Sequence, residues 1–294
     1  MSTLSAPKSK LRAKNRKPDD LGLVGKILFY VLLGLGALVS VFPFYWMFVV
    51  ATNDRGAVFH VPPLLTLGDQ FFDNFSRVLE KSDFFRALGN SLFVSSMVTV
   101  SVVFFCTLAG YAFAKYEFPL KNLLFYFVIG TLFVPQQLGV LPTYVIMAKL
   151  HWIDTYKALI VPAMVNAFGI FWMRQYISTA VHTELIEAGR IDGGGHFRIF
   201  WNIAIPVITP AMATLGILNF MTVWNDFFWP LVVLKNRENY TIQIALQQLF
   251  TTRDGLDYGM IMSATFTATL PLLIVFLLFS RWFIAGLTSG AIKS

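Results

Sequence analysis

Long stretches without any charged side chain recur along the chain. Six of them contain no Asp, Glu, Lys or Arg, and they cover residues 27–53, 87–114, 122–148, 158–173, 199–225 and 258–280. A bilayer core about 30 Å thick needs about 20 apolar residues in a helix that rises about 1.5 Å per residue. Five stretches reach that length. The fourth is shorter, but Lys157 and Arg174 flank it and can extend their charges to the two interfaces.

This pattern predicts an all-α integral membrane protein with six transmembrane helices. The expected spans are residues 27–52, 88–114, 122–147, 156–178, 202–224 and 260–284. A buried helix of a soluble protein can also lack charge, but six such stretches in one chain favour the membrane. Only 13% of the residues are charged, whereas soluble globular chains carry about 25%.

The spans divide the chain into four segments. The expected segments are a basic tail at 1–24, the first transmembrane helix with an outer loop at 25–85, a transmembrane core at 86–285 and a C-terminal tail at 286–294. The first apolar stretch is too long for a signal peptide and follows a polar tail of about 25 residues, so we expect no cleaved leader.

The basic residues predict the orientation. An even number of spans places both termini on one side, and that side carries 14 of the 23 Lys and Arg residues. The positive-inside rule therefore predicts cytoplasmic termini. The net charge of +7 could also suggest nucleic-acid binding. Topology and attraction to anionic lipid headgroups explain the same residues, so we expect the lipid bilayer as a partner and no nucleic acid.

Candidate chemistry is sparse. Cys106 is the only cysteine, so an internal disulfide is impossible and a metal-binding cluster is not expected. Two catalytic sequence patterns are missing, namely His-Glu-x-x-His and Gly-x-Ser-x-Gly, and the spans hold no paired carboxylates, which disfavours a membrane-embedded enzyme. The chain also lacks the Gly-x-x-x-x-Gly-Lys-Ser/Thr phosphate loop, so we expect that it does not hydrolyse ATP.

The segment 183–206, between the fourth and fifth predicted spans, combines charge, glycine and a helical pattern. Thr183 can cap a helix that carries Glu184 and Glu187 near its positive N-terminal end. Small or apolar residues recur along one face at Leu185, Ala188 and Ile191. We expect the helix to end at Gly193 with a positive φ, because glycine supplies the left-handed turn beyond a C-cap.

This segment resembles the "EAA loop" of bacterial ATP-binding-cassette importers, whose pattern is E-A-A, three residues, G, nine residues and I-x-L-P. The chain matches every spacing at Glu187, Ala188, Gly189, Gly193, Ile203, Ile205 and Pro206. It departs from the pattern where Gly189 replaces an alanine and Ile205 a leucine, both within the same class of small or apolar residue. The resemblance implies a cytoplasmic coupling helix that sits in a groove of an ATPase subunit. The implied coupling residues are Glu187, Ala188, Gly189, Asp192, Gly193 and Gly194.

From about Phe85 onward, the chain is similar to the maltose-type carbohydrate-uptake permeases, and among them to the smaller of the two paired subunits. The similar segments are 89–92, 109–114, 224–230 and 286–293. The resemblance implies the type I importer permease fold in a bacterial or archaeal cytoplasmic (inner) membrane, and a di- or oligosaccharide as substrate. It further implies a second permease subunit, two ATP-binding subunits and an extracytoplasmic solute-binding protein. ATP and Mg²⁺ would lie on the ATP-binding subunits, and this chain would be non-catalytic and bind no cofactor.

Polar residues within the uncharged spans are candidates for a substrate path. They are Gln136, Tyr144, Asn166, Asn219, Trp224 and Asn225, with the two aromatic rings as possible stacking surfaces for a sugar. For each of these asparagine and glutamine side chains, hydrogen bonding between helices is favoured over a role in the substrate path. An ion-coupled secondary transporter of small polar solutes is the alternative function. A proton-coupled one usually needs an intramembrane carboxylate or histidine, and the predicted spans contain neither.

Overall fold

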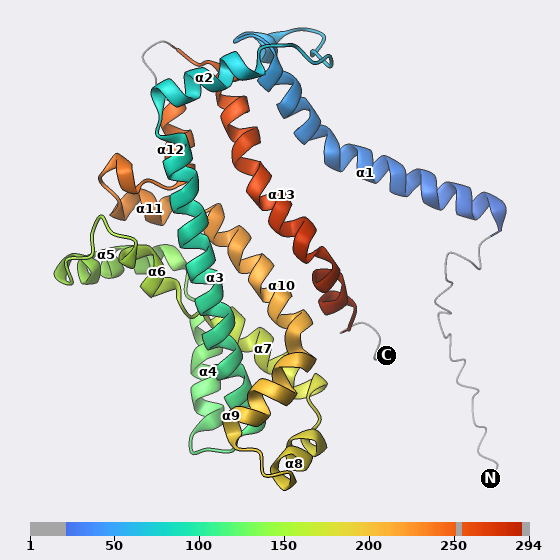
Figure 1. The fold of residues 1–294 in the computed structure, drawn as a ribbon, viewed down its shortest axis with the longest axis vertical. Coiled ribbons are helices and arrows are strands. Elements are labelled where there is room, and N and C mark those ends of the chain that lie inside the picture. The colour runs from blue at the N-terminus through green and yellow to red at the C-terminus, as the bar shows by residue number, and fades with distance from the viewer. Residues whose placement is uncertain (1–21, 251–254, 290–294) are drawn as a thin grey trace, which may run out of the picture.

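The computed structural model describes residues 22–250 and 255–289, and the regular elements in these residues are all helices (Figure 1). Three long helices form the centre: α3 (Phe84–Lys115), α10 (Ile205–Trp224) and α13 (Tyr258–Ser289). Helix α10 packs against both of the others, and α7 (Ala167–Ala180) packs on α3. The molecule is elongated, with α2 (Phe71–Lys81) at one end and α8 (Thr183–Ile191) at the other.

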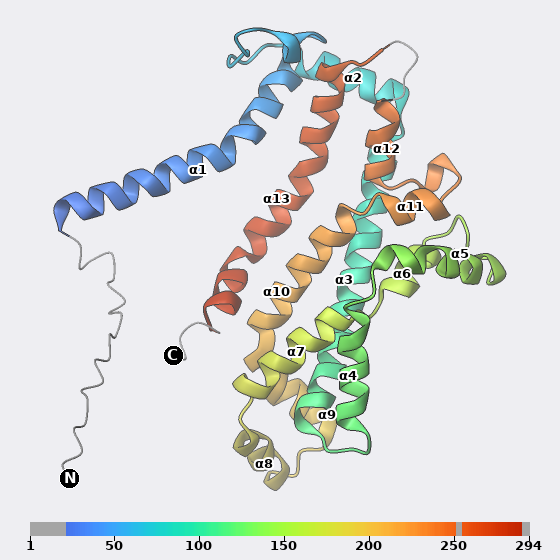
Figure 2. The same ribbon diagram turned by 180° about the vertical axis from the view of Figure 1, so that it is seen from behind.

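Helix α1 (Leu23–Thr52) projects away from this centre. Figures 1 and 2 both show it meeting α2 and α13 near its C-terminal end and diverging from them toward its N-terminus. Its buried residues are confined to the last turn, Val49–Thr52, while apolar side chains along the rest of the helix are exposed. Most of α1 therefore lacks a packing partner within the described part of this chain.

Most predicted spans are confirmed, because their charge-free stretches coincide with long helices. Among the described residues, five helices are long and apolar enough to cross a membrane, and a sixth span exists only if one bent pair is counted. The five are Leu23–Thr52, Phe84–Lys115, Lys157–Ala180, His196–Trp224 and Tyr258–Trp282. Of the predicted tails, residues 1–21 and 290–294 lie outside the described residues.

The third predicted span, at 122–147, is a bent pair of helices. Helix α4 (Lys121–Thr131) ends early, and a 3₁₀ turn, η3 (Gln136–Gly139), leads into α5 (Val140–Lys149). The two halves are bent by 95°. Pro135 accounts for the break, because proline has no N–H to continue the helix and pushes the residue before it toward extended conformations.

The fourth predicted span is also interrupted. It consists of α6 (Lys157–Ala163) and α7, joined at residues 164–166. Asn166 occupies the N-cap of α7, and its Oδ1 accepts a hydrogen bond from the Gly169 N–H at 2.7 Å. This side-chain bond satisfies one of the free N–H groups at the start of α7 and so stabilises the break.

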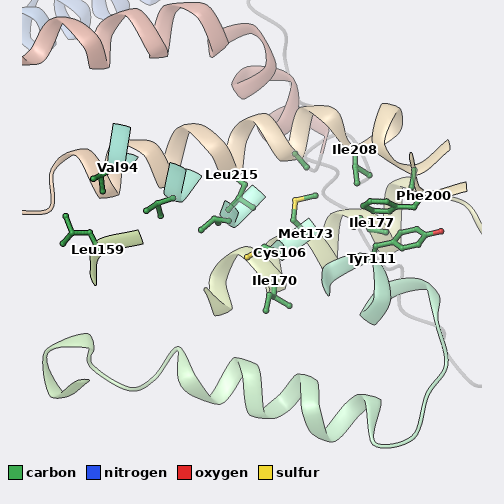
Figure 3. Close-up of a cluster of buried hydrophobic side chains, with 14 of the residues drawn as sticks. Val94, Cys106, Tyr111, Leu159, Ile170, Met173, Ile177, Phe200, Ile208 and Leu215 are labelled. Atoms are coloured by element: carbon green, nitrogen blue, oxygen red, sulfur yellow. The ribbon is translucent and has the colours of Figure 1, made fainter. Parts of the chain in front are cut away.

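The main apolar core lies between α3, α7 and α10. Figure 3 shows Cys106 of α3 beside Met173 and Ile170 of α7, with Leu215 and Ile208 of α10 on the other side. These side chains are buried. The core thus joins the central helices into one packed unit from which α8 extends at one end.

Shorter helices cover the α2 end of the molecule. They are η2 (Ala57–Phe59), α2, α11 (Phe228–Val233), η5 (Arg237–Asn239) and α12 (Ile242–Leu249). A second apolar cluster joins α2, α3, α10, α12 and α13 there, and it includes Phe84, Trp224 and Met260. The two ends of the protein therefore differ: one carries several packed loops and short helices, the other carries α8 and its loop.

Candidate coupling site

Helix α8 begins at Thr183, one residue earlier than a Thr183 cap would require. The N-cap residue is His182, and no side chain caps the helix, so the prediction that Thr183 caps it is wrong. Only Val181 and His182 separate α7 from α8, and both have extended backbones. Because these two residues make the turn between the helices, Thr183 is the first position free to be helical.

The end of α8 is a Schellman motif. Gly193 has φ +76°, which confirms the predicted left-handed residue at this position. The Gly194 N–H donates to the Gly189 carbonyl at 2.9 Å, and the Gly193 N–H donates to the Arg190 carbonyl at 3.0 Å. These are the 6→1 and 5→2 bonds of the motif, and they satisfy the last carbonyls of the helix. The turn therefore gives α8 a defined end.

Gly189 faces the chain itself. A Cβ atom at this position would lie 2.6 Å from Ile203 Cδ1 and 3.2 Å from Ile199 Cγ1. The missing Cβ brings α8 close to the helical segment that follows it, which comprises α9 (His196–Ile199) and η4 (Phe200–Ala204). Gly189 thus belongs to the packing that holds α8 in place, whereas Ala188 beside it is exposed.

The face of α8 that points away from the chain is apolar with acidic margins. Its apolar residues are Leu185, Ala188 and Ile191, and 86% of Ile191 is exposed. Glu187 and Asp192 are exposed beside them. A contiguous exposed apolar surface with a polar rim is typical of a site for a protein partner. Of the six predicted coupling residues, Glu187, Ala188, Asp192 and Gly193 lie on the exposed side, and Gly189 and Gly194 lie within the supporting contacts.

The chain widens into one π-helical turn, η4, just before α10. Pro206 lies in the first turn of α10 and has no N–H to donate to the carbonyl four residues earlier, which explains a wider turn at this point. The turn places Phe200 against Tyr111 of α3, with ring centroids 5.0 Å apart. The loop after α8 is therefore in direct contact with the central helix α3.

A second contact, to the residue that follows α3, was not predicted from the sequence. The Tyr116 hydroxyl lies 3.1 Å from His196 Nδ1 and their rings meet edge to face. A cavity of about 390 Å³ opens beside this pair and is lined mainly by aromatic and aliphatic side chains. Tyr116 and His196 are far apart in the sequence and belong to no shared pattern, so only the fold brings them together.

The predicted substrate-path residues lie in different surroundings. Asn166 donates to Asn219 Oδ1 at 3.4 Å, and Asn219 donates to Thr99 Oγ1 at 3.4 Å, which links α7, α10 and α3. This geometry matches the alternative interpretation of hydrogen bonding between helices. Gln136 is exposed at the 95° bend, and Tyr144 packs on the edge of the main core.

The remaining two candidates flank the end of α10. Trp224 is only 1% exposed and stacks on Phe220 inside the second apolar cluster, so its ring offers no open surface within this chain. Asn225 is exposed, and its side chain donates to the Met221 carbonyl at 2.8 Å. The substrate path remains a prediction.

A large cleft between α3, α10 and α13 is lined by none of the six substrate-path candidates. Its volume is about 540 Å³, and its walls are mainly carbon, with Val100 and Phe104 from α3, Met212 and Ile217 from α10, and Phe279 from α13. Four hydroxyl side chains, those of Ser96, Thr99, Thr107 and Thr209, are the polar part of a mainly apolar lining, whereas sugar hydroxyls need polar partners throughout. The cleft suits an apolar occupant better than a sugar.

Comparison with known proteins assigns the chain to a protein family. The family described as "Binding-protein-dependent transport system inner membrane component" matches residues 21–289. The arabinooligosaccharides transport system permease protein AraQ of Bacillus subtilis is 33% identical over 269 residues, which cover 90% of this chain and 94% of that protein. The sn-glycerol-3-phosphate transport system permease protein UgpE of Yersinia pestis is 31% identical over 271 residues, covering 90% and 96% respectively.

Solved structures share the fold. A bacterial ABC transporter involved in the import of the acidic polysaccharide alginate contains a chain that matches with a TM-score of 0.77 at 24% identity, covering 88% of this chain and 96% of that one. The alginate transporter in complex with an alginate pentasaccharide-bound periplasmic protein matches with a TM-score of 0.60 at 15% identity, covering 86% and 93%. These matches confirm the expected importer permease fold. The chain therefore belongs to the binding-protein-dependent transport system inner membrane component family, the permease subunits of ATP-binding-cassette transporters.

Proposed function

We propose that this chain is one of two permease subunits of an ATP-driven importer for a di- or oligosaccharide, and that α8 couples it to the ATPase. The observation that carries the proposal is the construction of the α8 loop. One face of α8 is exposed and apolar, while its other face is fixed to the chain through Gly189 and the Schellman turn. A helix built in this way can dock on a partner and transmit the partner's movement.

The contacts behind α8 give that movement a route into the membrane. Gly189 packs on Ile199 and Ile203, and the same segment carries Phe200 onto Tyr111 of α3. Closure of an ATPase pair on ATP binding would shift α8, and the tight packing would pass the shift to α3 and α10. This is a two-state element biased by a ligand bound to a different subunit.

The second permease subunit would cover the apolar surfaces that this chain leaves open. Helix α1 exposes large apolar side chains, among them Leu28, Leu32 and Leu38, and projects from the centre of the protein. The apolar cleft between α3, α10 and α13 is a further surface of this kind. Because lipid tails are as apolar as these side chains, the association would rest on close van der Waals packing between the two subunits.

An extracytoplasmic solute-binding protein would dock at the α2 end, opposite α8. A structured surface exists there, because Asp154 organises the segment 235–239. Its Oδ1 accepts from the Lys235 N–H at 2.8 Å and from the Asn236 N–H at 3.0 Å, and Asn239 Nδ2 donates to the Asp154 carbonyl at 2.8 Å. Burial opposes ionisation of Asp154, but the hydrogen bonds that its carboxylate accepts from Lys235, Asn236 and Asn239 outweigh burial and lower the pKa of the carboxyl.

The remaining parts of the proposal follow from this arrangement. Both termini and α8 would face the cytoplasm, as the distribution of Lys and Arg predicts. ATP and Mg²⁺ would be bound by the two ATPase subunits, and this chain would supply no catalytic group. The choice of a sugar as cargo is supported by the arabinooligosaccharide relative and by the alginate importer with the same fold.

Reconstitution tests the proposal against the ion-coupled alternative. Proteoliposomes that contain this chain, the second permease and the ATPase subunits, with the sugar-loaded binding protein outside, should take up sugar only when ATP is enclosed. Collapse of the proton gradient with a protonophore should leave uptake unchanged. Uptake by this chain without an ATPase, abolished by the protonophore, would instead support a secondary transporter.

A further inference from the structure

A cluster of polar side chains joins four segments at the α2 end of the protein. The last turn of α1, the loop after it, helix α2 and the first turn of α13 meet there. The cluster consists of Asn53, Arg55, Asn74, Arg77 and Asp257, and we refer to it as the outer polar cluster. It lies at the C-terminal end of the projecting helix α1, where that helix is buried.

Asn74 is the centre of the outer polar cluster. It lies on α2 and is 0% exposed. Its Nδ2 donates to the Ala51 carbonyl at 2.8 Å and to the Asn53 carbonyl at 2.8 Å. The last carbonyls of a helix have no partner within the helix, so Asn74 supplies donors that the end of α1 needs. Its Oδ1 accepts from an Arg77 guanidinium N–H, and the amide thereby uses both of its donors and its acceptor.

The outer polar cluster also fixes the start of α13. Asp257 Oδ2 accepts from Arg77 Nε at 3.1 Å and from Arg55 Nε at 2.9 Å, while its Oδ1 accepts from the Met260 N–H at 3.1 Å. A Cβ at Gly259 would lie 2.8 Å from Asn74 Nδ2, so α13 begins in direct contact with the amide. The end of α1 and the start of α13 are thus tied together through α2.

The direction of α1 depends on this junction. Burial of α1 is limited to Val49–Thr52, and the rest of the helix diverges from α13 (Figures 1 and 2). A helix of 30 residues is about 45 Å long at 1.5 Å per residue, so a rotation of about 10° at the junction moves its far end by about 8 Å. A small change around Asn74 therefore becomes a large displacement of the apolar surface of α1.

We propose that Asn74 is the positioning residue that sets the direction of α1, and that this direction allows α1 to pack with the second permease subunit. The proposal rests on the function proposed above, in which a second permease covers α1. The donors of Asn74 hold the end of α1, and Arg77 with Asp257 holds Asn74 against α13. The cluster acts on the assembly of the two permeases, without contact to substrate or nucleotide.

The test removes the donors of Asn74 while keeping its size. Asn74→Asp can still accept from Arg77 but cannot donate to the two carbonyls of α1, and Asn74→Ala removes both functions. Spin labels at Leu33 of α1 and Leu277 of α13, both exposed, report the angle of α1 by pulsed electron resonance in a Cys106→Ser background. Both variants should broaden the distance distribution and lower co-purification of the second permease about tenfold.

Asn90 provides a matched control. Its Nδ2 donates to the Glu238 carbonyl at 2.8 Å and to the Tyr240 carbonyl at 3.0 Å, and neither belongs to α1. Asn90→Asp should leave the distance between Leu33 and Leu277 unchanged. If Asn74→Asp fails to insert, Gly259→Ala displaces the Asn74 amide without removing a polar group and should broaden the same distribution.

The outcomes separate this proposal from the function on which it rests. A wild-type distance distribution and wild-type pairing in Asn74→Asp would overturn the positioning role of Asn74, as would an unchanged distribution in Gly259→Ala. A wild-type chain that pairs with no second permease would overturn the proposed function. In that case the distance between the labels, measured in the chain alone, would still decide whether Asn74 sets the direction of α1.

Discussion

Replacing Gly193 with valine tests the turn that ends α8. Gly193 has φ +76°, and no atom lies within 4 Å of a Cβ added there. The cost is therefore conformational and not steric: the left-handed region costs an L-residue about 1–2 kcal/mol, and a β-branched side chain is among the least tolerated. A penalty of this size changes a conformational equilibrium by a factor of about 5–30.

We expect Gly193→Val to insert and to pair with the second permease as the wild type does, because the turn is remote from the central core. Docking of the ATPase should weaken by about 5- to 30-fold, and ATP-driven sugar uptake should fall at least as far. The assay is co-purification of the ATPase subunits together with uptake in proteoliposomes. Gly193→Asn is the matched control, because asparagine tolerates the left-handed region, and it should lose much less.

Two results would refute this reasoning. Wild-type docking and uptake in Gly193→Val would show that the turn does not hold the coupling element. Equal damage from Gly193→Asn and Gly193→Val would show that the loss comes from an exposed side chain and not from the backbone conformation.

Three further predictions concern the α8 packing, the topology and the outer surface. Gly189→Leu should displace α8 and reduce ATPase co-purification, since its Cβ would meet Ile203 Cδ1 at 2.6 Å; Ile203→Ala in the same chain should restore part of it, and no rescue would contradict the contact. In a Cys106→Ser background, Phe72→Cys should react with an impermeant maleimide only from outside, and Ile191→Cys only from the cytoplasmic side; reaction of Phe72→Cys from the cytoplasm alone would overturn the topology. The pKa of Asp154 is lowered in the folded protein. The ionised carboxylate should therefore stabilise the fold above the usual aspartate pKa of about 4, and this stabilisation should be lost as the pH falls through the lowered pKa of the folded state. Thermal unfolding of the wild type and of Asp154→Asn should therefore differ most at neutral pH and converge in acid, whereas a constant difference would refute the role of the carboxylate.

The long helices could be predicted from the sequence because a charge-free stretch of sufficient length has few stable alternatives to a membrane span. The size of the bend at Pro135 could not be predicted, because proline either kinks or ends a helix depending on the packing around it. The hydrophobicity of a helix also does not determine the direction in which the helix runs. Nothing in the sequence of α1 indicates that most of this helix lies away from the centre of the protein.

The coupling loop was predictable where the backbone conformation depends on residue type. Gly193 was expected to take a positive φ and does so. The first residue of α8 was misplaced, because the two extended residues after α7 set it. The contact of Tyr116 with His196 and the bonds of Asn74 to the end of α1 depend on residues brought together by the fold. No local pattern marks such pairs.

Cross-linking from the exposed face of α8 tests the central claim most directly. Ala188 is exposed beside Glu187, so a photoreactive cross-linker attached to Ala188→Cys, in the Cys106→Ser background, should reach whatever docks there. In vesicles that contain the complete transporter, it should capture an ATPase subunit, with a yield that changes when ATP is bound. The same cross-linker at Phe72→Cys, at the opposite end of the protein, should capture none. Absence of an ATPase adduct at position 188 in transporters that take up sugar would contradict the account of α8 as the coupling helix.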